Sequence, residues 1–235
     1  MGKVAGTRTG GVGGYGRLDR GVILDAALRI AARPGSAEIR FRELGEALRA
    51  DPTAVYRHFR NKRELMEALI ERLMERIVGM VRSSDGWREV LTAMATGILE
   101  EFTRHPAVGL HLAEARPVGA SELVLVERVL AALEDAGLSG DALITYYGAL
   151  SGFAVSYVAA SCRELLTAGA TSVDVVEGMA WLPGGLTITA QSHPAVLRYA
   201  EQLGAMNFRS TYSATIGVLI EAAAQAGRPP GGEPG

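Results

Sequence analysis

Residues 51–62 combine side chains that could recognise nucleic acid. The stretch reads Asp-Pro-Thr-Ala-Val-Tyr-Arg-His-Phe-Arg-Asn-Lys, and helical spacing gives it an inward face of Val55 and Phe59. The outward face consists of Pro52, Thr53, Ala54, Arg57 and His58, with Tyr56 and Lys62 at its edge. A hydroxyl, methyl groups and positive charge suit base edges in the DNA major groove and the flanking phosphates. This stretch is therefore the first candidate for a functional site.

The elements that must position these side chains are short. Residues 41–62 predict a short helix, a tight turn, a second short helix and the start of a third. Asp51 is a favourable N-cap, and Pro52 suits the first helical position because its missing N–H would have no helical partner there. This layout is typical of a DNA-reading helix-turn-helix.

The pattern Tyr56-Arg57-His58-Phe59, followed by Asn61-Lys62 and Glu64-Leu65, resembles the tetracycline-repressor (TetR) family of transcriptional regulators. Residues 22–32 are similar to that family's first helix, and residues 64–81 to the helix that connects its reading head to its regulatory domain. Beyond about residue 82 the resemblance concerns architecture only.

The resemblance implies roles for individual residues. It implies base- or groove-facing positions for Arg42, Pro52, Thr53 and Ala54, and phosphate-facing positions for Tyr56, His58 and Lys62. Arg57 joins this set from the residue pattern alone. Simple packing at the helix edge is the alternative for Tyr56, and a hydrogen-bonded surface role is the alternative for His58.

Two residues depart from the family pattern. Arg49 stands in the turn where the family usually has Gly, and Gly45 stands in the first short helix where it usually has Ala. Arg49 predicts left-handed strain or an altered turn, whereas Gly45 should weaken its helix by about 1 kcal/mol relative to Ala.

Charge is segregated along the 235 residues. Residues 1–82 contain 16 Lys and Arg against 10 Asp and Glu, and residues 83–235 contain 8 against 16, so the halves carry +6 and −8 and sum to the net charge of −2. A basic front and an acidic rear are what a polyanion-binding protein needs. The 48% hydrophobic content excludes disorder of the whole chain.

Covalent and metal chemistry are not expected. Cys162 is the only cysteine, which excludes an intrachain disulfide and favours a reducing cytoplasm, and it is interpreted as a small buried hydrophobe rather than a reactive thiol. His111 and Glu114 have no apparent third ligand, so no metal or cofactor is expected. The first residues lack the apolar core of a signal peptide.

The sequence predicts an all-α chain in four parts. We expect a flexible Gly-rich basic arm at 1–17, a three-helix helix-turn-helix domain at 18–64, a helical regulatory and dimerisation domain at 65–226, and a disordered tail at 227–235. Residues 11–16 match G-x-G-x-x-G, but no strand precedes them, so the match is interpreted as compositional. Alternatively, the basic arm lies in the minor groove or on phosphates.

Apolar periodicity and turn signals predict the individual helices. Asn61 and Glu64 resemble a capping box that opens a long helix to about residue 81, and residues 83–86 break the chain. Further helices are expected at 87–104, 107–114, 121–136, 141–168 and 208–226. Residues 169–195 are the least defined part.

The apolar run 142–162 is long enough to span a membrane, but its Ser, Thr and Tyr residues and its lack of basic flanks favour a helix buried between subunits. Small residues recur along it at every fourth position and again near the C-terminus: Gly148, Gly152, Ser156 and Ala160, then Ser213 and Gly217. Such strips allow close helix approach. The resemblance implies a homodimeric four-helix interface there; contacts within one subunit are the alternative.

A ligand pocket in the rear domain is implied by the resemblance. Its candidate lining residues are Phe102, His111, Tyr146, Tyr147, Phe153, Tyr157 and Trp181. Each could equally be plain core. In the family picture, a small apolar or amphipathic ligand tilts the helix at 61–81 and changes the separation of the two reading heads.

The sequence therefore favours a cytoplasmic, dimeric regulator of double-stranded DNA, and a repressor over an activator because blocking a promoter needs no further contact. No nucleophile and base, paired carboxylates, phosphate loop or cofactor fingerprint indicates an enzyme. A small-molecule carrier or interaction protein of helical fold without specific DNA reading is the alternative.

Overall fold

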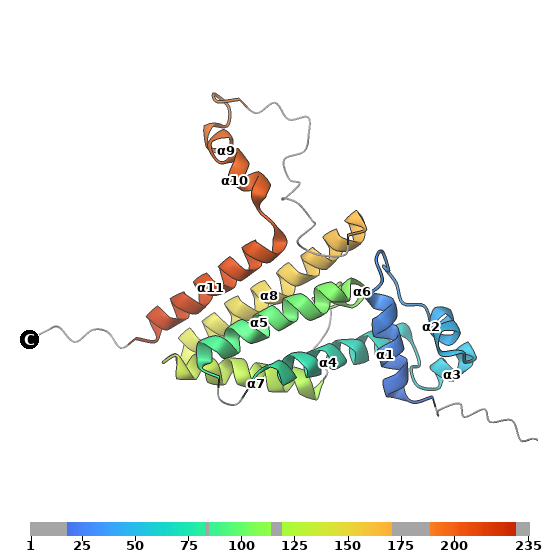
Figure 1. Ribbon diagram of the computed structural model, residues 1–235. Helices are drawn as coiled ribbons and strands as arrows, with labels where there is room; N and C mark the ends of the chain where they lie inside the picture. Colours follow the sequence, from blue (N-terminus) through green and yellow to red (C-terminus); the bar gives the residue numbers. More distant parts are fainter. Residues whose placement is uncertain (1–17, 83–84, 114–118, 171–188, 229–235) are drawn as a thin grey trace, which may run out of the picture.

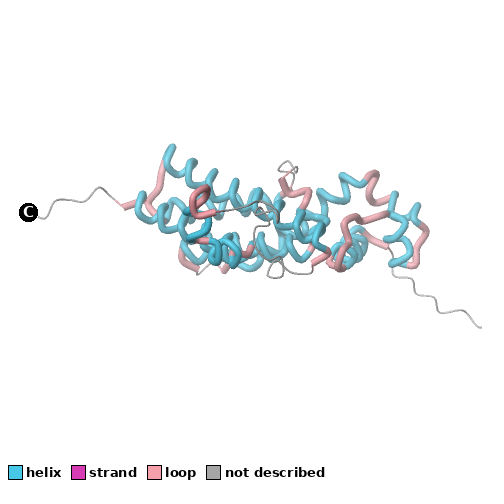
Figure 2. The backbone as a smooth tube through the Cα atoms, turned by 90° about the horizontal axis from the view of Figure 1, so that it is seen from above, coloured by secondary structure: helices cyan, strands magenta, loops and turns pink. Residues whose placement is uncertain are grey.

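The computed structural model describes residues 18–82, 85–113, 119–170 and 189–228, and its regular elements are all helices. The molecule is elongated, with α1, α2 and α3 at one end and the C-terminal end of α11 at the other (Figures 1 and 2). The all-α expectation is confirmed. The predicted arm, residues 11–16, Trp181 and most of the predicted tail lie outside the described residues.

Three short helices form the head: α1 (Arg20–Ala31), α2 (Phe41–Leu48) and α3 (Pro52–Tyr56). Asp19 caps α1 by accepting a hydrogen bond from the Val22 amide at 2.8 Å. The apolar stripe of α1 packs against α2 and α4, and the fully buried side chains of the head include Ile23, Ala27, Ile30, Leu44, Val55 and Phe59. This core fixes which side of α3 faces outward.

The long helix α4 (Lys62–Met80) joins the head to the rear helices. Asn61 Oδ1 accepts from the Glu64 amide at 2.9 Å, as expected for a capping box. The Glu64 carboxylate, however, accepts from the Arg60 amide at 3.0 Å, one residue before the position that a reciprocal box would use. One face of α4 is fully buried through Leu65, Leu69, Leu73 and Ile77, and α4 contacts α1 as well as α5 and α7.

The rear part is a bundle around α5. Its helices are α5 (Trp87–Arg104), α6 (Pro106–Gly109), α7 (Ala120–Asp135), α8 (Gly140–Ala168) and α11 (Phe208–Ala226). α5 contacts all four of the others as well as α4, and the Tyr212 hydroxyl ties α11 to it by donating to the Ala95 carbonyl at 2.9 Å. Burial raises the pKa of the Cys162 thiol to about 12, in agreement with its interpretation as a buried hydrophobe.

The predicted helices agree with these elements except at two places. Where a helix was expected at 107–114, the described residues form the four-residue helix α6, which begins at Pro106, and then turns to residue 113. Before α11 lie two short helices that were not predicted: α9 (Pro194–Arg198), which begins at the end of the poorly defined stretch 169–195, and α10 (Ala200–Ala205). Neither buries a residue. Both stand away from the bundle in Figure 1.

Among the described residues, α8 is the one helix long and apolar enough to cross a membrane, with a mean hydropathy of 1.3 over its most apolar window. It packs against α5, α6, α7 and α11, so one of its faces already belongs to the protein core.

Candidate functional site

The turn between α2 and α3 contains the strain that the sequence predicted. Arg49 ends α2 in the left-handed conformation, with φ 50° and ψ 39°, and among the described residues it alone has a positive φ without being glycine. The Ala50 amide donates to the Gly45 carbonyl at 2.9 Å and closes the turn. Left-handed backbone is unfavourable for a residue with a Cβ atom, so the surrounding contacts must hold Arg49 there.

Gly45 explains how this turn fits, and its role differs from the simple loss of helix stability expected for it. A Cβ atom at this buried position would lie 3.0 Å from the Ala50 carbonyl oxygen and 3.2 Å from both the nitrogen and Cγ of Pro52. Most Cβ contacts in proteins are wider. The missing side chain therefore lets the turn and the start of α3 approach the α2 backbone.

The start of α3 is held by the predicted cap. Asp51 Oδ1 accepts a hydrogen bond from the Thr53 amide at 2.8 Å. Hydrogen bonding by the Thr53 side chain, and to a smaller extent by the Thr53 backbone, lowers the pKa of the Asp51 carboxyl. Val55 and Phe59 are fully buried, whereas Thr53 and Arg57 are exposed. Pro52, Ala54 and His58 are half-buried on the same outward side. The structure thus leaves all five of these predicted residues at least partly accessible, while Val55 and Phe59 between them are buried.

The edge residues have partners within the head. The Tyr56 ring lies 4.5 Å from the Phe41 ring between centroids, yet 53% of Tyr56 is exposed, so packing and phosphate contact are compatible. Lys62 Nζ lies 2.7 Å from Glu38 Oε1, and hydrogen bonds from Lys62 and Arg40 lower the pKa of the Glu38 carboxyl.

Arg42 lies in the first turn of α2. Its side chain is 83% exposed and its Nε lies 3.8 Å from Glu46 Oε1, one turn further along the helix. A contact this long between exposed groups leaves the guanidinium free to reorient.

Arg20 is a functional candidate that sequence reasoning missed. From the first position of α1 its guanidinium donates to the carbonyl of His58 at 3.2 Å, lies 3.3 Å from Glu64 Oε1 and covers the Phe59 ring at 4.3 Å from the centroid. It therefore clamps the end of α3 to α1 and α4. Arg20 precedes His58 by 38 residues, and no local pattern signals this contact.

A cavity of about 300 Å³ lies in the rear bundle between α4, α5, α7, α8 and α11. Its walls are mostly aliphatic and include Met74, Leu91, Met94, Ile98, Leu125, Val126, Val129, Leu150, Ala154 and Ile216. The polar side chains at its wall are Glu122, Tyr147 and Ser151. The Ser151 hydroxyl donates to the Tyr147 carbonyl at 2.7 Å. Such a cavity suits an apolar molecule with few polar groups.

Of the predicted pocket residues that the structure describes, only Tyr147 lies on this cavity. Phe153 and Tyr157 instead join Tyr212 and Phe208 in an aromatic cluster between α8 and α11, with centroid separations of 5.1 to 5.8 Å. Phe102 is fully buried in the core, and Tyr146 and His111 are half-buried away from the cavity wall. The aliphatic walls were missed because nothing in sequence distinguishes them from core.

The predicted dimer strip is accessible. Gly148, Gly152, Ser156, Ser213 and Gly217 are exposed, and Ala160 is half-buried. A Cβ atom at any of the three glycines would meet nothing within 4 Å. Two large apolar side chains flank the strip, Ile144 at 60% and Val218 at 68% exposure. Gly152 also borders the cavity.

No group of three His, Cys, Asp or Glu that could hold a metal ion occurs within the ranges that the structure describes.

Two family models match the chain in sequence. Residues 23–69 match the model described as bacterial regulatory proteins, tetR family, and residues 82–195 match the tetracyclin repressor-like C-terminal domain. The first match covers most of the head and the first part of α4, and the second covers most of the rear bundle.

Curated relatives are similar over part of their length. The HTH-type transcriptional repressor DrrR1 of Streptomyces coeruleorubidus is 29% identical over 140 residues, which are 59% of this chain and 51% of that protein. The tetracycline repressor protein class A from transposon 1721 of Escherichia coli is 31% identical over 130 residues, or 54% and 60% of the two chains. The chain thus spans about half to three fifths of these relatives.

Solved structures share the fold over nearly the whole chain. The transcriptional regulator SCO7222 of Streptomyces coelicolor, a TetR, superposes with a TM-score of 0.69 at 22% identity, covering 90% of this chain and 100% of the other. The TetR family protein ActR of the same organism, in complex with actinorhodin, gives a TM-score of 0.67 at 18% identity and 90% and 99% coverage. Since the head and the rear bundle match two models of one family and the fold agrees throughout, the chain belongs to the TetR family of transcriptional regulators.

Proposed function

We propose that this chain is a dimeric repressor that reads a palindromic DNA operator through α3 of each protomer. The observation that carries the proposal is the accessible face of α3, which presents Thr53 and Arg57 outward from a base formed by the fully buried Val55 and Phe59. A recognition helix needs this combination of a fixed base and free polar tips. Arg42, Tyr56 and Lys62 are exposed as well and supply further groove and phosphate contacts.

The accessible strip supports dimerisation through α8 and α11. Five of its six small residues are exposed, and Ile144 and Val218 leave apolar surface beside them. A second copy packed there buries this surface and approaches closely at the glycines. Two heads about 34–36 Å apart then reach successive major grooves of a palindrome.

The cavity is the proposed site of the effector. Its mostly aliphatic wall and its volume of about 300 Å³ fit a small apolar or amphipathic molecule. The relative ActR is described in complex with actinorhodin, which supports binding of a small organic molecule in this fold. The effector releases the protein from DNA if it binds the arrangement of the heads that does not fit DNA more tightly than the arrangement that does.

A carrier without specific DNA reading is the second candidate, because the cavity alone would serve it. It gives no reason for an accessible polar face on α3.

The test is binding of the purified protein to the intergenic DNA beside its own gene, at several salt concentrations and with nonspecific competitor. Thr53→Ala should weaken binding to the preferred DNA sequence by about 1–3 kcal/mol per half-site and change which sequence is preferred. Lys62→Ala should weaken binding to all DNA sequences alike, and should reduce the slope of the logarithm of affinity against the logarithm of salt concentration by about 1 per head. Arg163→Ala, which removes an exposed charge from α8, is the matched control and should change neither.

A competitor-resistant shift with a palindromic footprint supports the regulator. Weak binding that is blind to sequence, at this DNA and in a genome-wide selection of bound fragments, would leave the carrier as the better explanation.

A further inference from the structure

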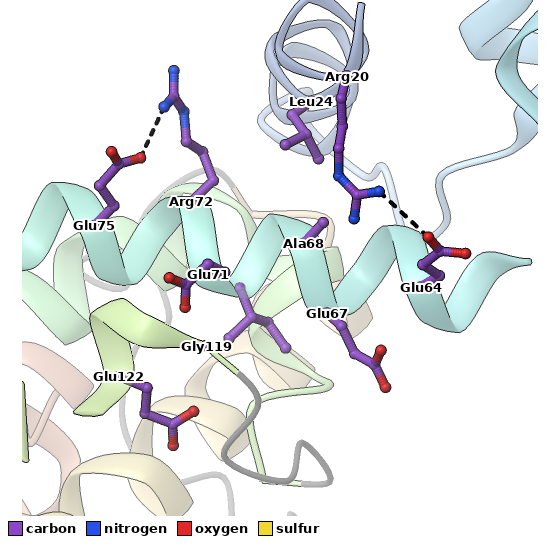
Figure 3. Close-up of a pocket in the computed structure, with 11 residues that line it drawn as sticks. Arg20, Leu24, Glu64, Glu67, Ala68, Glu71, Arg72, Glu75, Gly119 and Glu122 are labelled. Atoms are coloured by element: carbon purple, nitrogen blue, oxygen red, sulfur yellow. Dashed lines mark hydrogen bonds and ion pairs between the residues drawn. The ribbon is translucent and has the colours of Figure 1, made fainter. Parts of the chain in front are cut away.

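The first turn of α7 is capped from another helix. Glu71 on α4 accepts a hydrogen bond from the Ser121 amide at 2.8 Å, across 50 residues of sequence. The N-cap residue of α7 is Gly119, which has no side chain to satisfy the amides of that turn. Figure 3 shows Glu71 directed from α4 toward Gly119. A carboxylate that accepts from a helix N-terminus is also favoured by the helix dipole.

A glycine is needed at position 119 because of this contact and not because of the backbone conformation there. Its φ of −118° and ψ of 159° are open to any residue. A Cβ atom there, however, would collide with the Glu71 carboxylate. The glycine therefore makes room for the carboxylate, and a substitution as small as alanine must push it off the α7 amide.

The same helix that Glu71 caps forms a wall of the apolar cavity. Leu125, Val126 and Val129 of α7 line it, and Glu122, next to Ser121, borders both the cavity and the hollow drawn in Figure 3. A group that fills the cavity presses on α7 directly.

On its other side, α4 is bound to the head. Arg72 of α4 lies 3.8 Å from Asp25 of α1, and Arg20 of α1 lies 3.3 Å from Glu64 of α4. Glu71 is adjacent in sequence to Arg72. The hydrogen bond from α7 to Glu71 thus lies next to the α4 residue, Arg72, that contacts the head.

We propose that the hydrogen bond between Glu71 and the Ser121 amide is the latch through which filling of the cavity changes the position of α4, and with it DNA affinity. The inference rests on the proposed function. Bulk in the cavity displaces the first turn of α7, the latch opens, and α4 adopts an arrangement of the heads that binds DNA less well. With the latch already open, filling the cavity has no further effect on DNA affinity.

The effector is unidentified, so a side chain serves as the probe. Ala154 is buried at the cavity wall, and Ala154→Phe fills the space from α8; Ala154→Leu is the smaller version if the phenylalanine variant does not fold. Gly119→Ala and Glu71→Ala open the latch in two independent ways. Glu67→Ala is the matched control because Glu67 borders the same hollow but pairs with Arg63 on its own helix at 3.6 Å.

The first measurement is DNA affinity, with the competitor-resistant DNA fragment, in a cycle of these variants. Ala154→Phe should weaken binding by about tenfold in the wild-type and Glu67→Ala backgrounds, and by less than about twofold with Gly119→Ala or Glu71→Ala. Gly119→Ala should also have no effect once Glu71 is alanine. Equal weakening by Ala154→Phe in all four backgrounds would overturn the latch and place the coupling elsewhere, such as through α6, which contacts both α1 and α4.

The second measurement, amide hydrogen exchange at Ser121 by NMR, does not depend on DNA. Gly119→Ala, Glu71→Ala and Ala154→Phe should each accelerate exchange by about tenfold, and the double variants should add little more. Unchanged exchange in Ala154→Phe would show that the cavity does not act on the latch. If the wild-type protein binds no DNA specifically, the proposed function fails, and this measurement still decides whether the cavity controls the latch.

Discussion

Removal of the Arg20 clamp should weaken DNA binding without removal of a DNA contact. In Arg20→Ala the end of α3 loses a hydrogen bond at the His58 carbonyl, an ion pair with Glu64 and the cation that covers Phe59. The hydrogen bond contributes about 0.5–1.5 kcal/mol and the cation–π contact about 0.5–1 kcal/mol. The ion pair adds little because half of the Arg20 side chain is exposed, so the sum is roughly 1–2.5 kcal/mol per head.

Part of this energy becomes a cost of binding, because the loosened α3 must be ordered again on the DNA. If about 1 kcal/mol per head is spent in this way, two heads lose about 2 kcal/mol, which is roughly 30-fold in affinity. Arg20→Lys keeps the charge but loses the planar group over Phe59, so its loss should be smaller. Arg29→Ala removes an exposed charge from the same helix and is the control.

The assay is DNA binding as a function of salt, combined with chemical unfolding. Arg20→Ala should lower the unfolding midpoint and the affinity while leaving the salt slope unchanged, because a positioning residue releases no counterion. A salt slope reduced by about 1 per head would show instead that Arg20 itself contacts phosphate. Wild-type affinity and midpoint would refute the clamp outright.

Three further outcomes follow from single positions. Gly148→Leu places a large side chain in the proposed dimer strip and should yield folded monomers by light scattering; a stable dimer would move the interface elsewhere. Gly79→Ala should stabilise the protein by about 1 kcal/mol in chemical unfolding, since an added Cβ meets no atom within 4 Å. Gly45→Ala should instead destabilise it, because the added Cβ lies 3.0 Å from the Ala50 carbonyl oxygen. Stabilisation by both variants would show that the turn between α2 and α3 adjusts freely. Burial lowers the pKa of His105, whose Nδ1 lies 2.7 Å from the Glu101 carbonyl, so folding favours the neutral ring. The stability that this ring contributes should be intact above the unfolded pKa of about 6.5 and should fall as the pH drops below it. His105→Gln should flatten that part of the pH profile of the unfolding midpoint.

Local chemistry explains what could be predicted from sequence. The caps at Asp51 and Asn61 each bond an amide two or three residues away, so the start of α3 and the start of α4 follow from neighbouring residues. The outward set on α3 follows from the same short range, because the buried Val55 and Phe59 fix the helix rotation.

Contacts between distant residues explain what could not be predicted. Arg20 reaches His58 across 38 residues and Glu71 reaches Ser121 across 50, and no spacing rule relates such pairs. The cavity is another case. Aromatic residues such as Phe153 stand out in sequence, yet the wall is mainly aliphatic, and whether an aliphatic side chain borders a void depends on the packing of five helices.

The two departures from the family pattern belong to one turn, where Gly45 avoids a steric contact but does not relieve the strain at Arg49. Arg49 adopts a left-handed conformation that costs roughly 1–2 kcal/mol for a residue with a side chain. Gly45 lacks the Cβ that would press on Ala50 and Pro52, so the chain after Arg49 can fold back closely onto α2. An alanine at 45 would add crowding to strain in the same turn. Because the Asp51 cap and the buried Val55 then fix α3, the exchange of glycine between these two positions leaves the outward face of the recognition helix in place.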